Sequence, residues 1–470
     1  MADASPALLW LRNDLRRDDN PALAAAARHP GRLAILHLPE DGDGAAGGAV
    51  RWWLHHALAA LDSDLRRNGQ HLVLKPGAAA DVVPELVRKA GIQTVFWNRR
   101  HGPDGAGDET VAAALRDAGV AVETFPANLL VEPAEIAGSE GGPVRVYGAF
   151  RRRVLALDPE ARSPVPAPRH LPPPLEELAG DPLERFALLP TRPDWAGGLR
   201  AAWTPGEAGA EARLDALRDG GLAGYAEERD LPAVAATSQL SPHLRFGEIS
   251  PRRILAALAG LDGADAAKFR DELLWREFAW HVLGHVPEMG RDNLRPEFDA
   301  FPWAEPTPGD LAAWQHGTTG YPIVDAGMRE LWHTGWMHNR VRMIVASFLT
   351  KHLLVDWRIG EAWFRDTLVD ADAASNPFNW QWVAGSGYDA QPYFRIFNPV
   401  LQGEKFDADG AYVRRWVPEL ADVPDRFVHK PWTGPDEARP AGYPAPIVDH
   451  AFARQRALAA FEEMRRAAGA

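Results

Sequence analysis

The C-terminal half of the sequence carries tryptophans placed among carboxylates, arginines and asparagines. The chain has 18 tryptophans and no cysteine. The six of interest are Trp275, Trp303, Trp336, Trp357, Trp380 and Trp382. A tryptophan most often serves core packing, but this mixture of neighbours favours a site for a flat, redox-active ligand. Because cysteine nucleophiles and thiolate metal sites are excluded, the chemistry must come from other groups or a bound cofactor.

A carboxylate and an indole occupy one face of a predicted helix. Glu272 and Trp275 are three residues apart in the segment 266–286, whose apolar residues recur at helical spacing. Together they could hydrogen-bond and stack against one flat ligand. The alternative is a glutamate at the solvent edge of a packed tryptophan.

A second segment presents polar, soft and cationic groups together. Asn339 and Met343 are one helical turn apart, and His338 and Arg342 share a neighbouring face.

Two carboxylates, Asp370 and Asp372, precede the Trp380-Gln-Trp382 element. They could equally be helix-start or loop carboxylates. Residues two apart in a helix lie on nearly opposite faces, so the two tryptophans should have different surroundings. One could then serve a cofactor and the other a substrate.

The elements that position these residues follow two patterns. In the first 130 residues, short apolar runs predicted as strands alternate with amphipathic segments predicted as helices. The strands are 7–11, 32–38, 71–75, 93–97 and 120–125, and the helices are 21–28, 50–67, 81–90 and 110–118. This alternation predicts an α/β domain with a doubly wound parallel (Rossmann-like) sheet. The cluster Gly102, Gly105 and Gly107 lacks the G-x-G-x-x-G order and is predicted to be a loop.

The composition then changes twice. Residues 133–203 are rich in proline and glycine, which predicts a surface connector without periodic structure. From residue 204 helical periodicity takes over, and the segment 328–353 resembles 266–286 in this respect. With 470 residues we expect two domains. They are an α/β domain at 1–132 and, after the connector at 133–203, an almost entirely helical domain at 204–470.

Charge and hydropathy exclude several classes of protein. No apolar run approaches the length of a membrane span, and the N-terminus lacks a signal-peptide pattern, so we expect a cytoplasmic protein. The net charge of −13 speaks against general affinity for polyanions but allows a local basic groove. His281 and His285 have i, i+4 spacing but no evident third ligand, so we predict no metal site.

Several blocks spread along the chain resemble the photolyase and cryptochrome family. The first is Leu-Trp-Leu-Arg-Asn-Asp-Leu-Arg at 9–16, followed by Asp-Asn-Pro at 19–21. The matching blocks in the helical half are 237–242, 272–277, 319–325, 335–343, 370–382 and 393–399. The resemblance implies an N-terminal antenna-type domain and a helical domain that binds FAD. It also implies repair of cyclobutane pyrimidine dimers in DNA by electron transfer from light-excited reduced FAD.

The resemblance assigns the cofactor contacts residue by residue. They are Tyr225, Thr237, Ser238, Leu240, Ser241, Arg276, Trp336, Asn339, Arg342, Asp370, Asp372 and Asn376. The hydroxyls of residues 237, 238 and 241 would bind the pyrophosphate at a helix start, although such hydroxyls are commonly helix N-caps. Arg342 paired with Asp370 would place fixed charges near the isoalloxazine. Asn376 would face its N5 edge, and a neutral amide there favours a fully reduced, anionic flavin.

The resemblance also assigns the substrate contacts. Glu272 and Asn339 would act on the flipped-out dimer, Met343 would contact it, and Trp275 with Trp382 would form a stacking wall. The matching cations for DNA phosphates are Arg229, Arg340 and Arg395. The alternative for these arginines is an ordinary surface salt bridge.

Three tryptophans match the family's relay for reducing the flavin from the surface. In order of distance from the cofactor they are Trp380, Trp357 and Trp303. Residues 304–309, which follow Trp303, contain a one-residue length difference from relatives.

Two departures from the family pattern concern the antenna and one loop. Relatives that bind a folate antenna tend to have a glutamate after the Asn-Arg-Arg-Tyr segment, whereas here Asn-Arg-Arg-His at 98–101 is followed by Gly102. The antenna is therefore methenyltetrahydrofolate held differently, a deazaflavin, or absent. Gln391 replaces a small residue found in many relatives.

The second candidate function is a blue-light signalling cryptochrome. Asn376, the lesion-facing set and the short C-terminus favour repair instead. A repair enzyme for the (6-4) photoproduct would have a histidine where this chain has Asn339. We therefore expect a monomeric enzyme that binds dimer-containing DNA, double or single stranded, and that associates with the nucleoid when bound.

Overall fold

The chain divides into two units that each draw on several segments. In the computed structural model, residues 4–39, 47–138, 141–390, 394–436 and 440–468 are described. The first unit comprises residues 1–196, 203–222 and 238–288, and the second comprises 197–202, 223–237 and 289–470. The division does not follow a single cut in the chain, and the expected domain boundaries at 132 and 203 stay predictions. Gln391 lies outside the described residues.

A five-stranded parallel sheet organises the N-terminal part of the first unit, as predicted. Its strands are β1 (Ala7–Leu11), β2 (Leu33–His37), β3 (Leu72–Leu74), β4 (Thr94–Asn98) and β5 (Ala121–Phe125). Their spatial order is β3-β2-β1-β4-β5, and Ala7 of β1 pairs with Leu33 on one side and Thr94 on the other. The strands β1, β2 and β3 are buried throughout, which suits a sheet covered on both faces.

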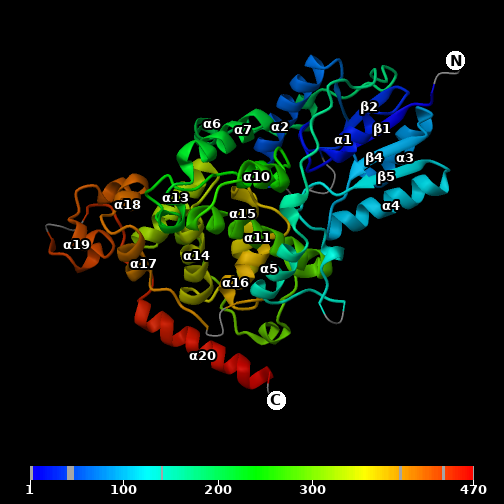
Figure 1. Cartoon of the computed structure of the whole chain (residues 1–470). Helices are drawn as coiled ribbons and strands as arrows, with labels where there is room; N and C mark the ends of the chain where they lie inside the picture. The colour runs from blue at the N-terminus through cyan, green and yellow to red at the C-terminus, as the bar shows by residue number, and fades with distance from the viewer. Residues whose placement is uncertain (1–3, 40–46, 139–140, 391–393, 437–439, 469–470) are drawn as a thin grey trace. The chain divides into compact units, whose positions relative to one another are not determined.

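Helices cover both faces of this sheet (Figure 1). They are α1 (Pro21–Ala26), α2 (Gly48–Arg67), α3 (Ala79–Lys89) and α4 (Pro103–Asp117). Val83 and Val87 of α3 and Leu115 of α4 share one core cluster with Trp10 and Trp97 of the sheet. α1 packs against β1, β4 and β5. The α/β prediction is therefore confirmed.

The predicted loop at the glycine cluster is wrong. α4 begins at Pro103, seven residues before the predicted start, and it includes Gly105 and Gly107. Pro103 occupies the first helical position, where its fixed φ favours helix initiation. Gly102 precedes it with φ +68°, a left-handed conformation that glycine adopts readily.

The segment predicted to lack periodic structure also contains a helix, α5 (Tyr147–Ala156). Its residues lie between the proline-rich stretches, so no proline interrupts them. Phe150 and Val154, four residues apart, are buried, and the Phe150 ring is 5.1 Å from that of Phe278 on α11 (Ala264–His285). Packing on α11 thus stabilises a helix whose surrounding composition predicts a loop. The other helices of this unit are α7 (Glu207–Ala216), α9 (Ser241–Arg245) and α10 (Pro251–Ala257).

The second unit is almost entirely helical in its described residues. Its longer helices are α12 (Pro308–His316), α13 (Pro322–Thr334), α14 (Asn339–Ser347), α15 (Trp357–Thr367), α16 (Ser375–Ala384), α17 (Pro399–Phe406) and α20 (His450–Ala468). Shorter ones are α6 (Gly197–Ala202), α8 (Tyr225–Glu228), α18 (Ala411–Trp416) and α19 (Asp425–Val428). The segment 328–353, expected to be periodic throughout, is broken after α13 because Gly335 has φ +67°.

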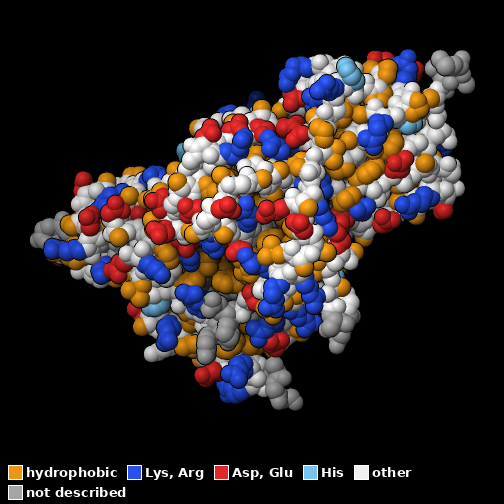
Figure 2. Space-filling view, viewed as in Figure 1, with side chains coloured by type: hydrophobic (Ala, Val, Ile, Leu, Met, Phe, Trp, Pro, Cys, Tyr) orange, Lys and Arg blue, Asp and Glu red, His pale blue; other side chains and the backbone are white. Residues whose placement is uncertain are grey.

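The last helix, α20, is amphipathic. Ala453, Ala457, Ala460 and Met464 are buried, and the last three join a cluster with Phe298. Basic side chains are visible on the surface near this helix (Figure 2), and its own basic residues other than His are all arginines. In the described part of the chain, no helix combines the length and the apolar character needed to cross a membrane.

Candidate functional site

An arginine–aspartate pair joins α14 to the segment before α16, and it is the pair expected from the sequence. Arg342 Nη1 and Nη2 donate to the two oxygens of Asp370 at 3.0 and 2.8 Å. Arg342 Nε also donates to Met337 O at 2.7 Å. The Asp370 side chain is only 3% exposed. Bidentate geometry and a third hydrogen bond fix both charges in place.

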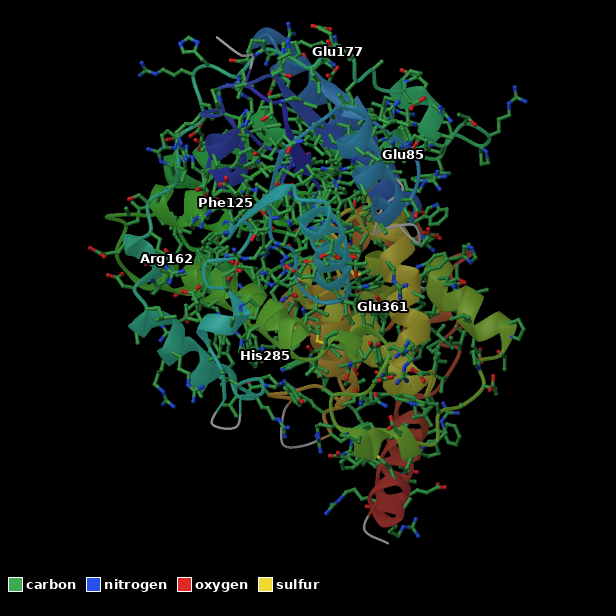
Figure 3. All side chains as sticks on the ribbon, turned by 90° about the vertical axis from the view of Figure 1, so that its right-hand side faces the viewer. Glu85, Phe125, Arg162, Glu177, His285 and Glu361 are labelled. Atoms are coloured by element: carbon green, nitrogen blue, oxygen red, sulfur yellow. The ribbon has the colours of Figure 1, made fainter. Side chains whose placement is uncertain are left out.

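Asn376 on α16 is held by Glu361 on α15. Its Nδ2 donates to Glu361 Oε1 at 2.9 Å and to Glu361 O at 3.2 Å. Glu361, labelled in Figure 3, is 4% exposed and also pairs with Arg365. Among the described residues no hydrogen bond reaches Asn376 Oδ1, so this amide oxygen can accept one from a ligand. Sequence reasoning missed Glu361, because Glu361 and Arg365 have the spacing of an ordinary surface pair.

Asp372 has a different role from Asp370. It accepts hydrogen bonds from Ala374 N at 2.8 Å, from Ser375 N and from Ser375 Oγ at 2.9 Å. The helix-start alternative therefore holds for Asp372, which lies just before α16. It does not hold for Asp370, whose two carboxylate oxygens accept hydrogen bonds from Arg342.

A buried carboxylate supports the N-terminus of α14. Glu330 Oε2 on α13 accepts hydrogen bonds from Tyr412 Oη at 2.6 Å and from His338 N at 3.3 Å. Burial raises the pKa of Glu330 to about 7. His338 caps α14 by accepting from Arg340 N at 3.2 Å. These contacts fix the backbone from which Asn339 projects, and that residue is exposed.

This raised pKa predicts a pH-dependent stability. The carboxyl ionises at lower pH in the unfolded chain, so the free energy of unfolding should fall as the pH rises from about 4.5 through about 7. Glu330 should contribute about 3 kcal/mol to this loss, and the Glu330→Gln protein should lack that contribution. Urea titrations of both proteins at about pH 4 and about pH 8 measure the difference between them. A difference that does not change with pH would show that Glu330 has the same pKa in the folded and the unfolded protein.

Two of the three arginines assigned to DNA are engaged with one aspartate. Arg340 Nη2 is 2.7 Å from Asp230 Oδ2, and Arg229 Nη1 is 3.6 Å from Asp230 Oδ1. In the structure without DNA, the salt-bridge alternative therefore describes Arg229 and Arg340.

The third of these arginines, Arg395, is exposed, and its guanidinium carbon is 4.8 Å from the Phe397 ring centroid. Met343 is half-buried beside Arg340.

The three tryptophans assigned to the relay lie on or near α15. Trp357 begins this helix, is 0% exposed, and donates through Nε1 to Asn293 Oδ1 at 2.9 Å. One turn later, the Trp380 ring lies against Gly360, where an added Cβ would be 2.2 Å from Trp380 Cη2.

The residue after Trp303 is hydrogen-bonded to the segment just before α15. Ala304 N donates to Leu354 O at 2.8 Å. Trp303 is half-buried, which suits the surface end of a relay.

The contact at Gly360 yields a prediction. Gly360→Ala should force the Trp380 ring out of its position and lower the free energy of unfolding by at least about 1–3 kcal/mol, because the core there has no room for a methyl group. Chemical denaturation and near-ultraviolet circular dichroism of the tryptophans measure both effects. The control is Gly309→Ala at an open position of α12, which should be close to neutral. A stable Gly360→Ala protein with an unchanged spectrum would contradict this packing.

As predicted, Trp380 and Trp382 have different surroundings. Trp380 is buried, with its ring 4.9 Å from Phe364. Trp382 is half-buried and donates from Nε1 to Asp389 O at 3.1 Å.

The remaining assigned residues divide between the two units. Ser238, Leu240, Ser241, Glu272, Trp275 and Arg276 belong to the first unit. Tyr225, Thr237 and Trp336 belong to the second, where Tyr225 is buried and the Trp336 ring centroid is 5.9 Å from Arg342 Cζ. α9 begins at Ser241, and its N-cap Leu240 offers no side-chain hydrogen bond, so the simple N-cap alternative does not explain Ser241.

On α11, Trp275 is one half of a stacked pair. The Trp275 and Tyr147 rings are 3.7 Å apart with an angle of 7° between them. Tyr147, which sequence reasoning missed, therefore covers one face of this tryptophan. Glu272, on the same helix face, pairs with Lys268 at 2.9 Å. Arg276 Nη1 donates to Asn128 O at 3.2 Å.

Packing explains the glycine found where folate-binding relatives tend to have a glutamate. A Cβ on Gly102 would be 2.8 Å from Leu283 Cγ, and the φ of +68° disfavours any other residue. Nearby, Glu132 pairs with Arg99 at 2.9 Å and with His101 at 3.5 Å. Elsewhere in this unit, His281 Nε2 accepts from Val144 N at 2.9 Å, which is a structural contact.

Two family models match the chain, and together they span more than half of it. Residues 7–170 match the model described as DNA photolyase, and residues 269–463 match the FAD binding domain of DNA photolyase. The chain belongs to the DNA photolyase family. FAD is therefore its cofactor, as expected.

Individual relatives agree with this family. A deoxyribodipyrimidine photo-lyase of Agrobacterium fabrum is 52% identical, with 98% of each chain covered. Cryptochrome-1 of Arabidopsis thaliana is 37% identical over 97% of this chain and 70% of its own length. A bacterial class III photolyase from Agrobacterium tumefaciens, known from a crystal structure, has 50% sequence identity to this chain. The two structures superpose with a TM-score of 0.95, and the match covers 99% of each chain. These comparisons confirm the expected enzyme class, a photo-lyase.

Proposed function

We propose that this enzyme binds DNA containing cyclobutane pyrimidine dimers, double or single stranded, and that the residues assigned above carry out light-driven repair. The observation that carries the proposal is the pair of fixed groups in the second unit. One is the bidentate Arg342–Asp370 pair. The other is Asn376, whose Nδ2 donates a hydrogen bond to Glu361 and whose Oδ1 can accept one from a ligand. A neutral amide and a balanced ion pair suit a ligand that must remain reduced without being protonated by its surroundings.

The donor set fits FAD. Arg342, Asp370 and Asn376 would hold the isoalloxazine, and Tyr225, Thr237, Ser238, Leu240, Ser241, Arg276, Trp336, Asn339 and Asp372 are the other proposed contacts. When bound and reduced, FAD supplies one photoexcited electron to the substrate and takes it back. Glu361 holds the amide of Asn376 so that its oxygen, and not its NH₂ group, is presented to the cofactor. An N–H group of the ligand at this edge can therefore donate a hydrogen bond to Asn376 Oδ1, and this oxygen carries no proton that it could transfer to the ligand.

The chain's own residues position the lesion. Glu272 would hydrogen-bond the dimer, Asn339 and Met343 would contact it, and Trp275 with Trp382 would stack on its rings. Tyr147 stacks on Trp275, so the tryptophan offers a single face to substrate. No strong acid, base or nucleophile is needed, and the protein contributes position and exclusion of water.

Arg229, Arg340 and Arg395 would bind DNA phosphates. For Arg229 and Arg340 this means exchanging Asp230 for phosphate, whereas Arg395 is exposed and needs no exchange. Lesion binding should therefore weaken with salt and depend little on neighbouring sequence.

The 50% identical relative is a class III photolyase, and we propose the same class here. We retain the domain assignment of an antenna-type domain at 1–132, a connector at 133–203 and an FAD- and lesion-binding domain at 204–470. The packing at Gly102 leaves no room for a glutamate there, so three alternatives stay open: methenyltetrahydrofolate held by a different contact, a deazaflavin, or no antenna. We propose a monomer that acts in the cytoplasm, at the nucleoid when DNA is bound.

The deciding experiment illuminates the reduced protein with dimer-containing single- and double-stranded DNA and follows loss of the dimer. Light-dependent loss in both substrates is expected. Bound FAD without loss of the dimer would instead favour the signalling function of cryptochromes. Extraction of the chromophores from the same preparation identifies the antenna.

A further inference from the structure

A pocket in the second unit is lined by aromatic side chains and one buried amine, Lys351, to which the proposed repair mechanism gives no role. Its aromatic walls are Phe298, Trp382, Phe394, Phe397 and Phe461. Arg295, Arg395 and Lys351 also line it. The rings come from different elements, since Trp382 is on α16 and Phe461 is on α20.

Lys351 is the least expected member of this pocket. It is 1% exposed, and among the described residues no carboxylate pairs with it. Its Nζ donates to Ala384 O and lies 3.4 Å from the centroid of the Phe394 ring. Burial lowers the pKa of the amine well below its ordinary value. A lysine without a carboxylate partner is costly to bury, so packing does not account for it. An amine has more N–H groups than the one that Ala384 uses, so Lys351 can donate to an incoming acceptor.

The lining indicates the chemistry of the occupant. Aromatic walls favour a flat, uncharged group that stacks, and a buried amine favours one that carries a hydrogen-bond acceptor on its edge. A phosphate would use neither feature as well, because it has no face to stack. Arg395, exposed beside the pocket, could bind the phosphate attached to such a group. A nucleobase within a DNA strand meets all of these requirements.

The position of the pocket narrows the choice of base. Trp382, which would stack on the dimer, also lines this pocket. Extrusion of a dimer from duplex DNA leaves the opposite bases without partners. We propose that the pocket receives one of these unpaired bases, which is held by the aromatic walls and by a hydrogen bond from Lys351. Occupancy would keep the opened duplex from closing again, and the proposal rests on the proposed function.

The test compares dissociation constants of the FAD-loaded wild type and of Lys351→Met for three lesion-containing DNAs. Methionine keeps an unbranched apolar chain and removes the donors. For a duplex with adenines opposite the dimer, Lys351→Met should bind about tenfold more weakly, within the range for one stacked base. For a single strand, and for a duplex with abasic sites opposite the dimer, the two proteins should bind equally. Lys405→Met, which removes an exposed lysine charge on α17, is the matched control and should not distinguish the three DNAs.

A second variant guards against a purely structural effect of Lys351. Val383→Phe fills the pocket from α16 while leaving Lys351 in place, and it should also weaken only the adenine duplex. The proposal is overturned if Lys351→Met binds all three DNAs like the wild type, or weakens all three alike. Failure of the wild type to repair the single strand would instead overturn the proposed function, which the affinity comparison does not address.

Discussion

Arg342→Gln should release FAD and lower the free energy of unfolding by about 3–5 kcal/mol. The substitution leaves Asp370, whose side chain is 3% exposed, without the two hydrogen bonds that it accepts from Arg342. A carboxylate that loses its arginine at that depth either stays charged at high cost or takes up a proton. Both outcomes remove the fixed charges proposed to hold the isoalloxazine. Flavin content after gel filtration and urea denaturation of the protein measure the two effects.

Two companion variants separate stability from cofactor binding. Arg66→Gln breaks an exposed helix pair with Asp62 and should change stability by less than about 0.5 kcal/mol, with FAD retained. The double variant Arg342→Gln with Asp370→Asn removes both charges, so it should regain much of the lost stability but not the FAD. A single Arg342→Gln protein that keeps its FAD would refute the assignment of this pair to the cofactor.

Trp357→Phe should reduce photoreduction of the flavin to the rate of a protein without a relay. Trp357 is buried at the start of α15, one turn from Gly360, against which Trp380 packs. Phenylalanine preserves most of the packing but is much harder to oxidise, so the electron path from Trp303 is interrupted. Repair by chemically reduced Trp357→Phe should equal that of the wild type, because the relay takes no part in splitting the dimer. Absorbance changes under blue light with an external reductant measure the first effect, and loss of dimers measures the second.

Trp314→Phe is the matched control. Trp314 is also fully buried, and its ring lies 6.3 Å from Trp380. It has no exposed end through which an external reductant could act, so its loss should leave photoreduction intact. Slow photoreduction in Trp314→Phe, or failed repair by pre-reduced Trp357→Phe, would contradict the relay order.

The parallel sheet was predictable because its signal is local. Short apolar runs separated by amphipathic segments predict buried parallel strands and crossover helices, and every predicted strand overlaps an observed one. The errors occurred where a distant contact decides the conformation. α5 forms in a proline-rich region because Phe150 and Val154 are buried, with the Phe150 ring against Phe278 on α11. The early start of α4 is a different case, because it follows from two adjacent residues, Gly102 in the left-handed conformation and Pro103 at the first helical position.

By itself the sequence determined the five strands and the helical character of the second half, and its resemblance to one family indicated the cofactor and the Arg342–Asp370 pair. Only the tertiary structure decided that Glu361 holds Asn376 and that Lys351 ends among aromatic rings. The physical reason is that backbone periodicity and turn chemistry are set by residues a few positions apart. Which side chain faces which across the interior depends on how distant elements pack, and one sequence alone carries no local signal for that.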